Sequence, residues 1–97
     1  MREAINNVAH QRYEFVVDNW TALVTYQRTG SRVVLLHTLV PAALEGKGVG
    51  TALARSILED IRRQGLKVVP ECPLIAGFIK RHPEFEDLVG PAKGNPP

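Results

Sequence analysis

The chain has 97 residues and a formal net charge of +2, from 12 lysines and arginines against 10 aspartates and glutamates, so it has room for one domain. The small net charge disfavours nucleic acid as the main partner, and no stretch approaches the length of a membrane span. A single cysteine cannot form an internal disulfide and the first residues lack a signal-peptide core, so we expect a soluble, cytoplasmic protein.

The first third of the chain alternates apolar and polar residues, which is the two-residue period of a β-strand. Asp18-Asn19 and Thr29-Gly30-Ser31 have the side chains of tight turns, and such short turns join antiparallel strands. The aromatic residues Tyr13, Trp20 and Tyr26 are expected in the core. We therefore predict an antiparallel meander of three strands at residues 12–17, 20–28 and 32–40, to which residues 5–8 add a short edge strand.

The last of these strands is almost entirely apolar from Val33 to Val40. Such a run is typical of a central strand covered on both faces. His37 and Thr38 interrupt the run, and Pro41 ends it because proline cannot donate to a strand ladder.

The second half of the chain predicts helices around one more strand. Apolar residues at helical spacing indicate a helix over residues 49–64, which ends before Gly65. The strand at residues 66–71 follows a helical crossover, so it should run parallel to the strand at 32–40. A second helix is expected over residues 74–81 with Pro73 at its start, and one further turn over 84–89. We expect one mixed α/β (α+β) domain over residues 1–89 and a disordered tail over 90–97.

Three glycines at alternate positions, Gly46, Gly48 and Gly50, lie between the apolar strand and the first helix. The first N–H groups of a helix have no partner within the helix, and the helix dipole makes that end partly positive. Glycines let a phosphate approach these groups closely, so the turn is a candidate pyrophosphate site. The alternative is an ordinary flexible connection.

Two other phosphate-binding motifs can be tested on spacing. A P-loop requires Gly, four residues and then Gly-Lys-Ser/Thr, and no glycine is followed by that arrangement. A dinucleotide fingerprint requires a third glycine where this chain has Thr51, although Glu71 lies about 20 residues on, where such folds place a ribose-binding acid. The chain also has too few β-α units for that fold.

The order of elements and the turn Glu45-Gly46-Lys47-Gly48-Val49-Gly50 resemble the GCN5-related N-acetyltransferases (GNAT). Their acetyl-CoA signature is Arg/Gln-x-x-Gly-x-Gly/Ala, so both glycines match and Glu45 replaces the usual Arg or Gln. His37-Thr38 and the segments at residues 68–73 and 81–83 resemble a short, single-domain subgroup of about a hundred residues. The resemblance covers roughly residues 13–89.

This resemblance implies that acetyl-CoA is the co-substrate, with no metal, and that an amine of unknown identity is the acceptor. It also implies that the strand ending at Cys72 splays from its neighbour and leaves a gap for the cofactor. We expect no nucleic-acid or membrane partner, and a monomer or weak dimer. The residues expected to contact the cofactor are Leu39, Val40, Glu45, Gly46, Lys47, Gly48, Val49, Gly50, Thr51, Phe78, Lys80 and Arg81. The alternatives are a core position for the aromatic Phe78, and a role for Lys80 and Arg81 in complementing the dipole at the end of a helix.

Cys72 and His37 are the candidate catalytic residues. Cys72 precedes a helix N-terminus, which favours the nucleophilic thiolate, so it can carry an acetyl group or lie close to one. The alternative is an ordinary buried cysteine. His37 can deprotonate the acceptor amine or activate Cys72; the alternative is a buried histidine bonded to a neighbouring strand or turn. His82 is expected to cap helix carbonyls.

The sequence thus predicts an acetyl-CoA-dependent N-acetyltransferase that acts on a primary amine of a protein or a small molecule. The alternative is a non-catalytic module that binds CoA or another protein through the same fold. Cys72 and His37 favour the enzyme, whereas the small size favours the module.

Overall fold

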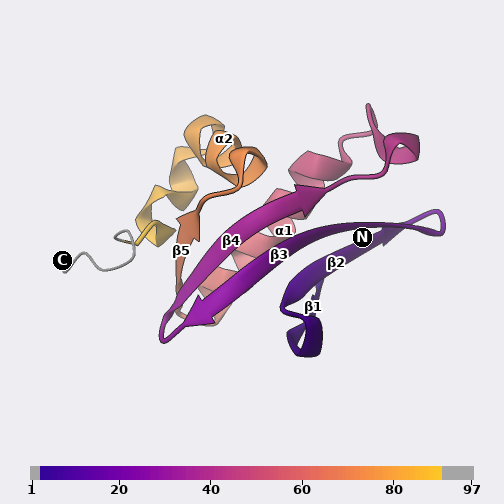
Figure 1. Ribbon diagram of the computed structural model, residues 1–97. Helices are drawn as coiled ribbons and strands as arrows, with labels where there is room; N and C mark the ends of the chain where they lie inside the picture. Colours follow the sequence, from indigo (N-terminus) through magenta and orange to yellow (C-terminus); the bar gives the residue numbers. More distant parts are fainter. Residues whose placement is uncertain (1–2, 91–97) are drawn as a thin grey trace.

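The computed structural model describes residues 3–90, which form a five-stranded sheet with the strand order β1-β2-β3-β4-β5 (Figure 1). The disordered tail that the sequence predicts over 90–97 lies outside the described residues, apart from Gly90. The strands are β1 (Ile5–Asn7), β2 (Arg12–Val17), β3 (Trp20–Thr29), β4 (Arg32–Leu39) and β5 (Lys67–Pro70). The α-helices are α1 (Val49–Arg63) and α2 (Pro73–Arg81), and the 3-10 helices are η1 (Val8–His10), η2 (Ala42–Leu44) and η3 (Pro83–Leu88).

The first four strands form the predicted antiparallel meander. Asp18 and Asn19 have φ angles of 51° and 69°, the left-handed conformation that a two-residue hairpin turn requires. Gly30 has a φ of 61° in the next turn, where glycine adopts this conformation without strain. The predicted edge strand near the N-terminus is confirmed as β1.

The strand β5 runs parallel to β4, as the helical crossover through α1 predicts. Helix α1 ends where expected, and Gly65 follows it with a φ of 72°. His82 ends α2, with its Nδ1 atom 3.0 Å from the carbonyl oxygen of Phe78, which confirms the predicted cap. None of the helices in residues 3–90 combines the length and the apolar character needed to cross a membrane.

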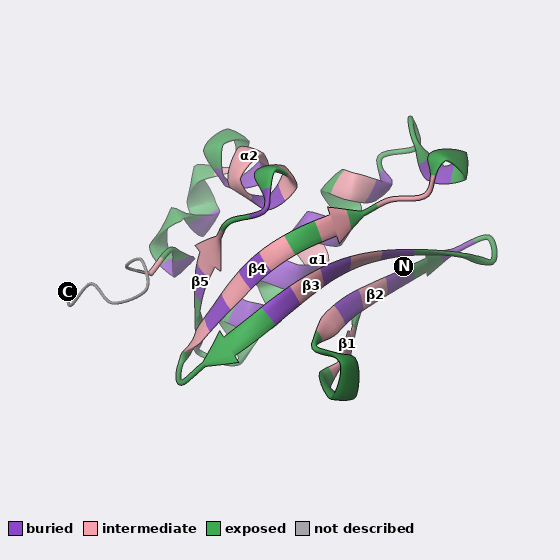
Figure 2. Cartoon of the chain, in the orientation of Figure 1, coloured by how far each residue is buried: buried purple, intermediate pink, exposed green. Residues whose placement is uncertain are grey.

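The core lies between the sheet and the helices (Figures 1 and 2). The apolar stripe of α1 is buried as predicted, and α2 packs against α1 and β5. The strand side chains that contribute to this core alternate along β2, β3 and β4: Tyr13, Phe15, Val17, Ala22, Val24, Tyr26, Val33 and Leu35.

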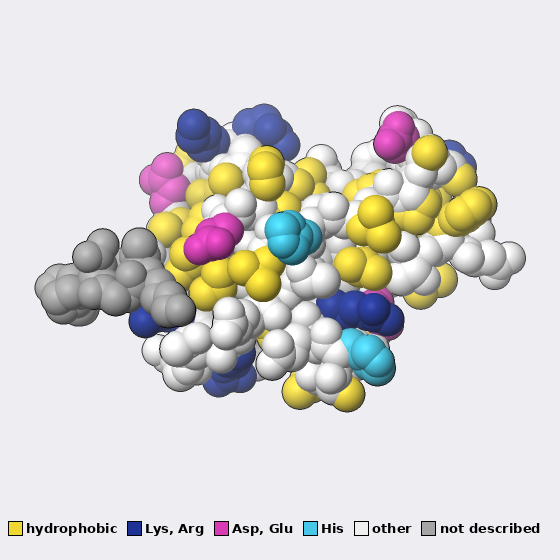
Figure 3. Space-filling view, viewed as in Figure 1, with side chains coloured by type: hydrophobic (Ala, Val, Ile, Leu, Met, Phe, Trp, Pro, Cys, Tyr) yellow, Lys and Arg dark blue, Asp and Glu magenta, His cyan; other side chains and the backbone are white. Residues whose placement is uncertain are grey.

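The opposite side of the sheet, which we call the open face, has no helix over it in the described part of the chain (Figure 1). The prediction that β4 is covered on both faces is therefore wrong: Val34 and Leu36 are only half-buried, and Leu39 is 60% exposed. Trp20 is 49% exposed, so its predicted place in the core is also wrong. Figure 3 shows apolar side chains gathered on this face.

Candidate functional site

A β-bulge divides β4 at Leu36. Leu35 pairs with Tyr26 and His37 pairs with Thr25, so Leu36 is an extra residue without a partner in β3. A bulge of this kind reverses the alternation of side chains beyond it. Thr38 pairs with the buried Val24 and faces the core, whereas His37 is exposed on the open face.

The parallel pair of β4 and β5 opens at the same level. Its last register pair is Leu35 with Pro70, and the Leu35 carbonyl oxygen accepts hydrogen bonds from the amides of Glu71 (3.1 Å) and Cys72 (3.0 Å). Beyond that point His37, Thr38 and Leu39 pair only with β3, and no other described strand bonds to the far side of Leu36–Leu39. We call this side the free edge. It offers backbone donors and acceptors to an extended ligand.

Cys72 lies where the two strands separate, at the N-cap of α2. Its side chain is 1% exposed and belongs to the core cluster. A hydrogen bond joins its Sγ atom to the Oγ1 atom of Thr38. Thr38 is therefore a site residue to which the sequence assigned no role of its own, although His37-Thr38 carries part of the family resemblance and its hydroxyl interrupts an apolar strand. An extra residue at Leu36 is needed to bring it to the thiol.

His37 does not share this contact. Within residues 3–90, no hydrogen bond joins its ring to Cys72 or to any other side chain. Its exposure shows that the alternative of a buried, bonded histidine is wrong. The imidazole stands beside the free edge and is open to solvent, where it can accept a proton from an approaching amine.

The glycine turn, residues 45–51, leads into α1 with its backbone exposed. Gly46 and Gly48 have φ angles of 80° and 73°, and an added Cβ at either would meet nothing within 4 Å. The amide of Ala52 donates to the Gly48 carbonyl at 3.1 Å, and no side chain among the described residues caps the turn of helix before it. Lys47 and Thr51 are exposed in this turn, and with the uncapped amides they fit a phosphate group, whereas the exposed carboxylate of Glu45 adds no attraction for one.

Gly50 brings the starts of the two helices together. A Cβ at Gly50 would lie 3.2 Å from the Cδ1 atom of Leu74 in the first turn of α2. This close approach gives Gly50 a packing role that does not depend on a ligand. It also places the end of the glycine turn next to the helix that begins after Cys72, so one region holds both features.

The three residues of α2 that were predicted to contact the cofactor differ in burial. Phe78 is fully buried, and its ring stacks on His82 at a centroid distance of 4.0 Å, so it has the expected core position and leaves no exposed surface for a cofactor contact. Lys80 and Arg81 are exposed in the last turn of α2, about 9 Å along the helix axis from Leu74.

The side chains with shifted pKa values lie away from this region. Burial raises the pKa of the Tyr13 phenol, and its hydrogen bond to Asp60 (2.7 Å) acts in the same direction. The Arg12 guanidinium lowers the pKa of Glu14, and Arg62 lowers that of Asp87. Among the described residues, no group of His, Cys, Asp and Glu side chains is arranged to hold a metal ion.

These features define a small mixed α/β domain in which a strand edge opens beside an uncapped, glycine-rich helix start. The chain belongs to the family described as GCN5-related N-acetyl-transferase, whose model matches residues 12–88. The resemblance inferred from the glycine turn and the element order is thereby confirmed.

The chain is also similar to curated relatives in sequence and to a solved structure in fold. Protein NATD1 from Bos taurus and from Homo sapiens is 35% identical over 63 residues, which is 64% of this chain and 56% of each relative. The chain therefore covers little more than half the length of these relatives. A solution structure of a GCN5-like protein from Staphylococcus aureus has the same fold, with a TM-score of 0.69 at 22% identity, over 96% of this chain and 92% of that one.

Proposed function

We propose that this chain is an acetyl-CoA-dependent N-acetyltransferase that moves the acetyl group to a primary amine. Membership of the GCN5-related family supports the reaction class. The observation that carries the proposal is the juxtaposition of the free edge at Leu36–Leu39 with the uncapped amides of the glycine turn. An extended thioester with a diphosphate at one end matches that pair of features.

The diphosphate binds at the amides that start α1, where the helix dipole favours negative charge. Lys47 and the Thr51 hydroxyl are the nearest exposed side chains of the turn that can add hydrogen bonds to it. The amide groups of the pantetheine arm pair with the backbone of Leu39 and Val40. Lys80 and Arg81 supply positive charge toward the ribose phosphate from the last turn of α2.

In direct transfer, the amine nitrogen forms a bond to the acetyl carbonyl carbon. The carbon–sulfur bond of the thioester then breaks, and its electron pair leaves on the CoA sulfur. The amine must lose a proton first, because an ammonium group has no lone pair for attack. We assign that proton to His37, whose ring is exposed on the open face beside the free edge.

In a covalent route, the Cys72 thiolate attacks the same carbonyl carbon and CoA leaves as its thiolate. The acetyl group then passes from Sγ to the amine. The hydrogen bond from Thr38 supports this route because a hydroxyl can donate to a thiolate and stabilise its charge. Thr38 is a positioning residue in this proposal.

A CoA-binding module without turnover is the second candidate. The burial of Cys72 at 1% exposure favours it, because the acetyl group must reach a thiol that is covered in this conformation. The two candidates share the cofactor site and differ in whether an acetyl group moves.

Two measurements separate them. Titration of the labelled protein with CoA, acetyl-CoA and NAD, followed by amide NMR, should give shifts centred on residues 46–51 with the CoA species only. Incubation with acetyl-CoA and a panel of primary amines should then release CoA. Shifts without release would support the module, and the absence of shifts would overturn both candidates.

The variants Cys72→Ala and His37→Gln assign the roles. Intact mass after incubation with acetyl-CoA should show one added acetyl group on the parent chain and none on Cys72→Ala. Full transfer by Cys72→Ala would exclude the covalent route. His37→Gln should remove an ionisation from the pH profile of transfer while it leaves the CoA-induced shifts unchanged.

A further inference from the structure

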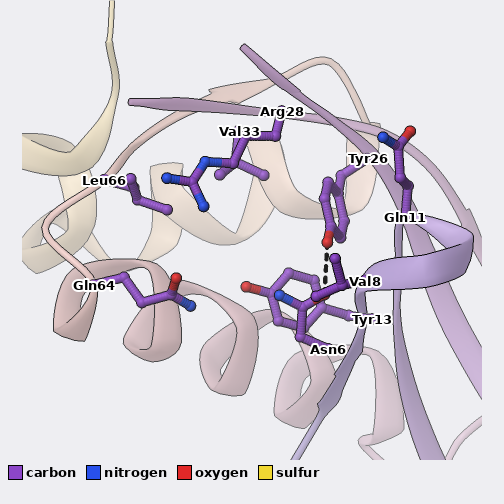
Figure 4. A pocket seen from close by; sticks show the side chains of 9 residues that line it. All are labelled: Asn6, Val8, Gln11, Tyr13, Tyr26, Arg28, Val33, Gln64 and Leu66. Atoms are coloured by element: carbon purple, nitrogen blue, oxygen red, sulfur yellow. Dashed lines mark hydrogen bonds between the residues drawn. The ribbon is translucent and has the colours of Figure 1, made fainter. Parts of the chain in front are cut away.

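A hollow lies at the opposite end of α1 from the glycine turn. It has a volume of about 310 Å³, at the low end of the range for small-molecule sites (Figure 4). One wall is the sheet, a second is the segment that follows α1, and a third is the N-terminal strand with η1. The lining residues are Asn6, Val8, Gln11, Tyr13, Tyr26, Arg28, Val33, Gln64 and Leu66.

The floor of this hollow is apolar and aromatic. Tyr13, Tyr26, Val33 and Leu66 are each at most 8% exposed. The two tyrosine rings lie 5.5 Å apart between centroids and are tilted by 48°. Their hydroxyls are used within the protein, since Tyr26 donates to Asn6 (2.6 Å) and Tyr13 donates to Asp60 (2.7 Å). The small exposed parts of these rings, together with Val33 and Leu66, form a narrow apolar surface that suits a planar apolar group.

The rim is polar and carries one charge. Arg28 is the only charged residue in the lining, and Figure 4 shows its guanidinium directed into the hollow. Its Nε atom donates to the Gly30 carbonyl at 3.0 Å, which orients the group. Its two terminal nitrogens have no hydrogen-bond partner among residues 3–90, so they remain available as a pair of donors for a carboxylate.

The acidic group nearest to the hollow is already satisfied. Asp60 accepts hydrogen bonds from Tyr13, from Gln64 (2.6 Å) and from Arg63 (3.3 Å). The other polar groups of the lining are the side-chain amides of Asn6, Gln11 and Gln64, whose N–H groups can donate to a ligand.

We propose that this hollow binds a small aromatic carboxylate, with its ring on Tyr13 and Tyr26 and its carboxylate on the Arg28 guanidinium. The site is separate from the glycine turn, so a test of this proposal does not depend on whether the chain transfers an acetyl group.

The test uses three probes of the same shape and different charge: benzoate, benzamide and benzamidine. In amide NMR titrations, benzoate should shift the resonances of Tyr13, Tyr26 and Leu66, with a dissociation constant on the order of 1 mM. Benzamide should bind several-fold more weakly, and benzamidine should cause no saturating shift there. Equal shifts from the three probes, or none with benzoate, would overturn the proposal.

Arg28→Gln should weaken benzoate binding by about tenfold, because it removes a charge-assisted pair of hydrogen bonds. Arg12→Gln is the matched control: it makes the same change of net charge in the ion pair with Glu14, outside the lining. It should leave benzoate affinity within about twofold. Equal losses in the two variants would show a general charge effect and reject the site.

Discussion

The two halves of β4 have opposite characters although they belong to one strand. The first half, Arg32–Leu35, pairs on both sides and buries Val33 and Leu35. The second half, Leu36–Leu39, pairs on one side and leaves His37 and Leu39 exposed. The bulge at Leu36 separates them. The first half therefore stabilises the domain, whereas the second half is less paired and less buried, so its backbone can bind a ligand.

The largest expected effect comes from truncating one side chain in each half. Leu35→Ala should lower the free energy of unfolding by about 2–5 kcal/mol, because Leu35 is fully buried in the core. Leu39→Ala should change it by no more than about 0.5 kcal/mol, because Leu39 is largely exposed. Urea unfolding measures both. Equal losses would contradict the division of β4 into two halves.

The next comparison uses two glycines with the same backbone conformation. Gly48→Ala and Gly30→Ala each force a residue with a Cβ into positive φ, so each should cost about 1–2 kcal/mol of stability. Neither added methyl group meets another atom within 4 Å. Because only Gly48 lies in the glycine turn, calorimetry should show weaker CoA binding for Gly48→Ala and unchanged CoA binding for Gly30→Ala. A matching loss of CoA affinity in Gly30→Ala would show that stability, not the turn, controls binding.

Two threonines on neighbouring strands, Thr38 in β4 and Thr25 in β3, test whether the Thr38 hydroxyl contributes to stability. Thr38→Val removes the hydroxyl bound to Cys72 and should cost about 1 kcal/mol in urea unfolding. The Oγ1 atom of Thr25 is buried without a hydrogen-bond partner in the described chain. Thr25→Val should therefore be neutral or slightly stabilising. The opposite order of stabilities would remove Thr38 from the site.

The smallest effect concerns the ion pair that attaches η3 to α1. Arg62 contacts both carboxylate oxygens of Asp87 at 2.9 Å and holds its pKa below the ordinary value of 3.8. A lowered pKa in the folded state adds stability above the ordinary pKa, and that stability is lost as pH falls through the folded value.

The melting temperature of Asp87→Asn should therefore lie below that of the parent chain at pH 7 and converge with it at strongly acidic pH. Glu86→Gln is the matched control, since Glu86 is exposed and makes no ion pair within residues 3–90. A constant difference between Asp87→Asn and the parent chain at all pH values would contradict this account.

Much of the fold follows from local sequence patterns. The alternation at residues 12–17 and the turn-forming pair Asp18-Asn19 give the meander, and Gly65 marks the end of α1. The stripe of α1 is buried because a single amphipathic face must cover the sheet. These features depend on neighbours in the chain, so periodicity and turn chemistry are sufficient to predict them.

The details of the candidate site depend on pairing between distant strands. Strict alternation along β4 would place His37 on the same face as Leu35, and only the extra residue at Leu36 turns Thr38 toward Cys72 instead. An apolar run likewise does not reveal that one face stays open, as the exposure of Leu39 shows. The bulge and the open face follow from register and from the number of helices available to cover the sheet.

Amide hydrogen exchange with and without saturating CoA tests the central claim most directly. On CoA binding, exchange should become slower for the amides of Leu36–Leu39 that point away from β3 and for the amides that start α1. Exchange in Arg32–Leu35 should be unchanged because those amides are already paired. Unchanged exchange at the free edge and the glycine turn in the presence of bound CoA would contradict the account.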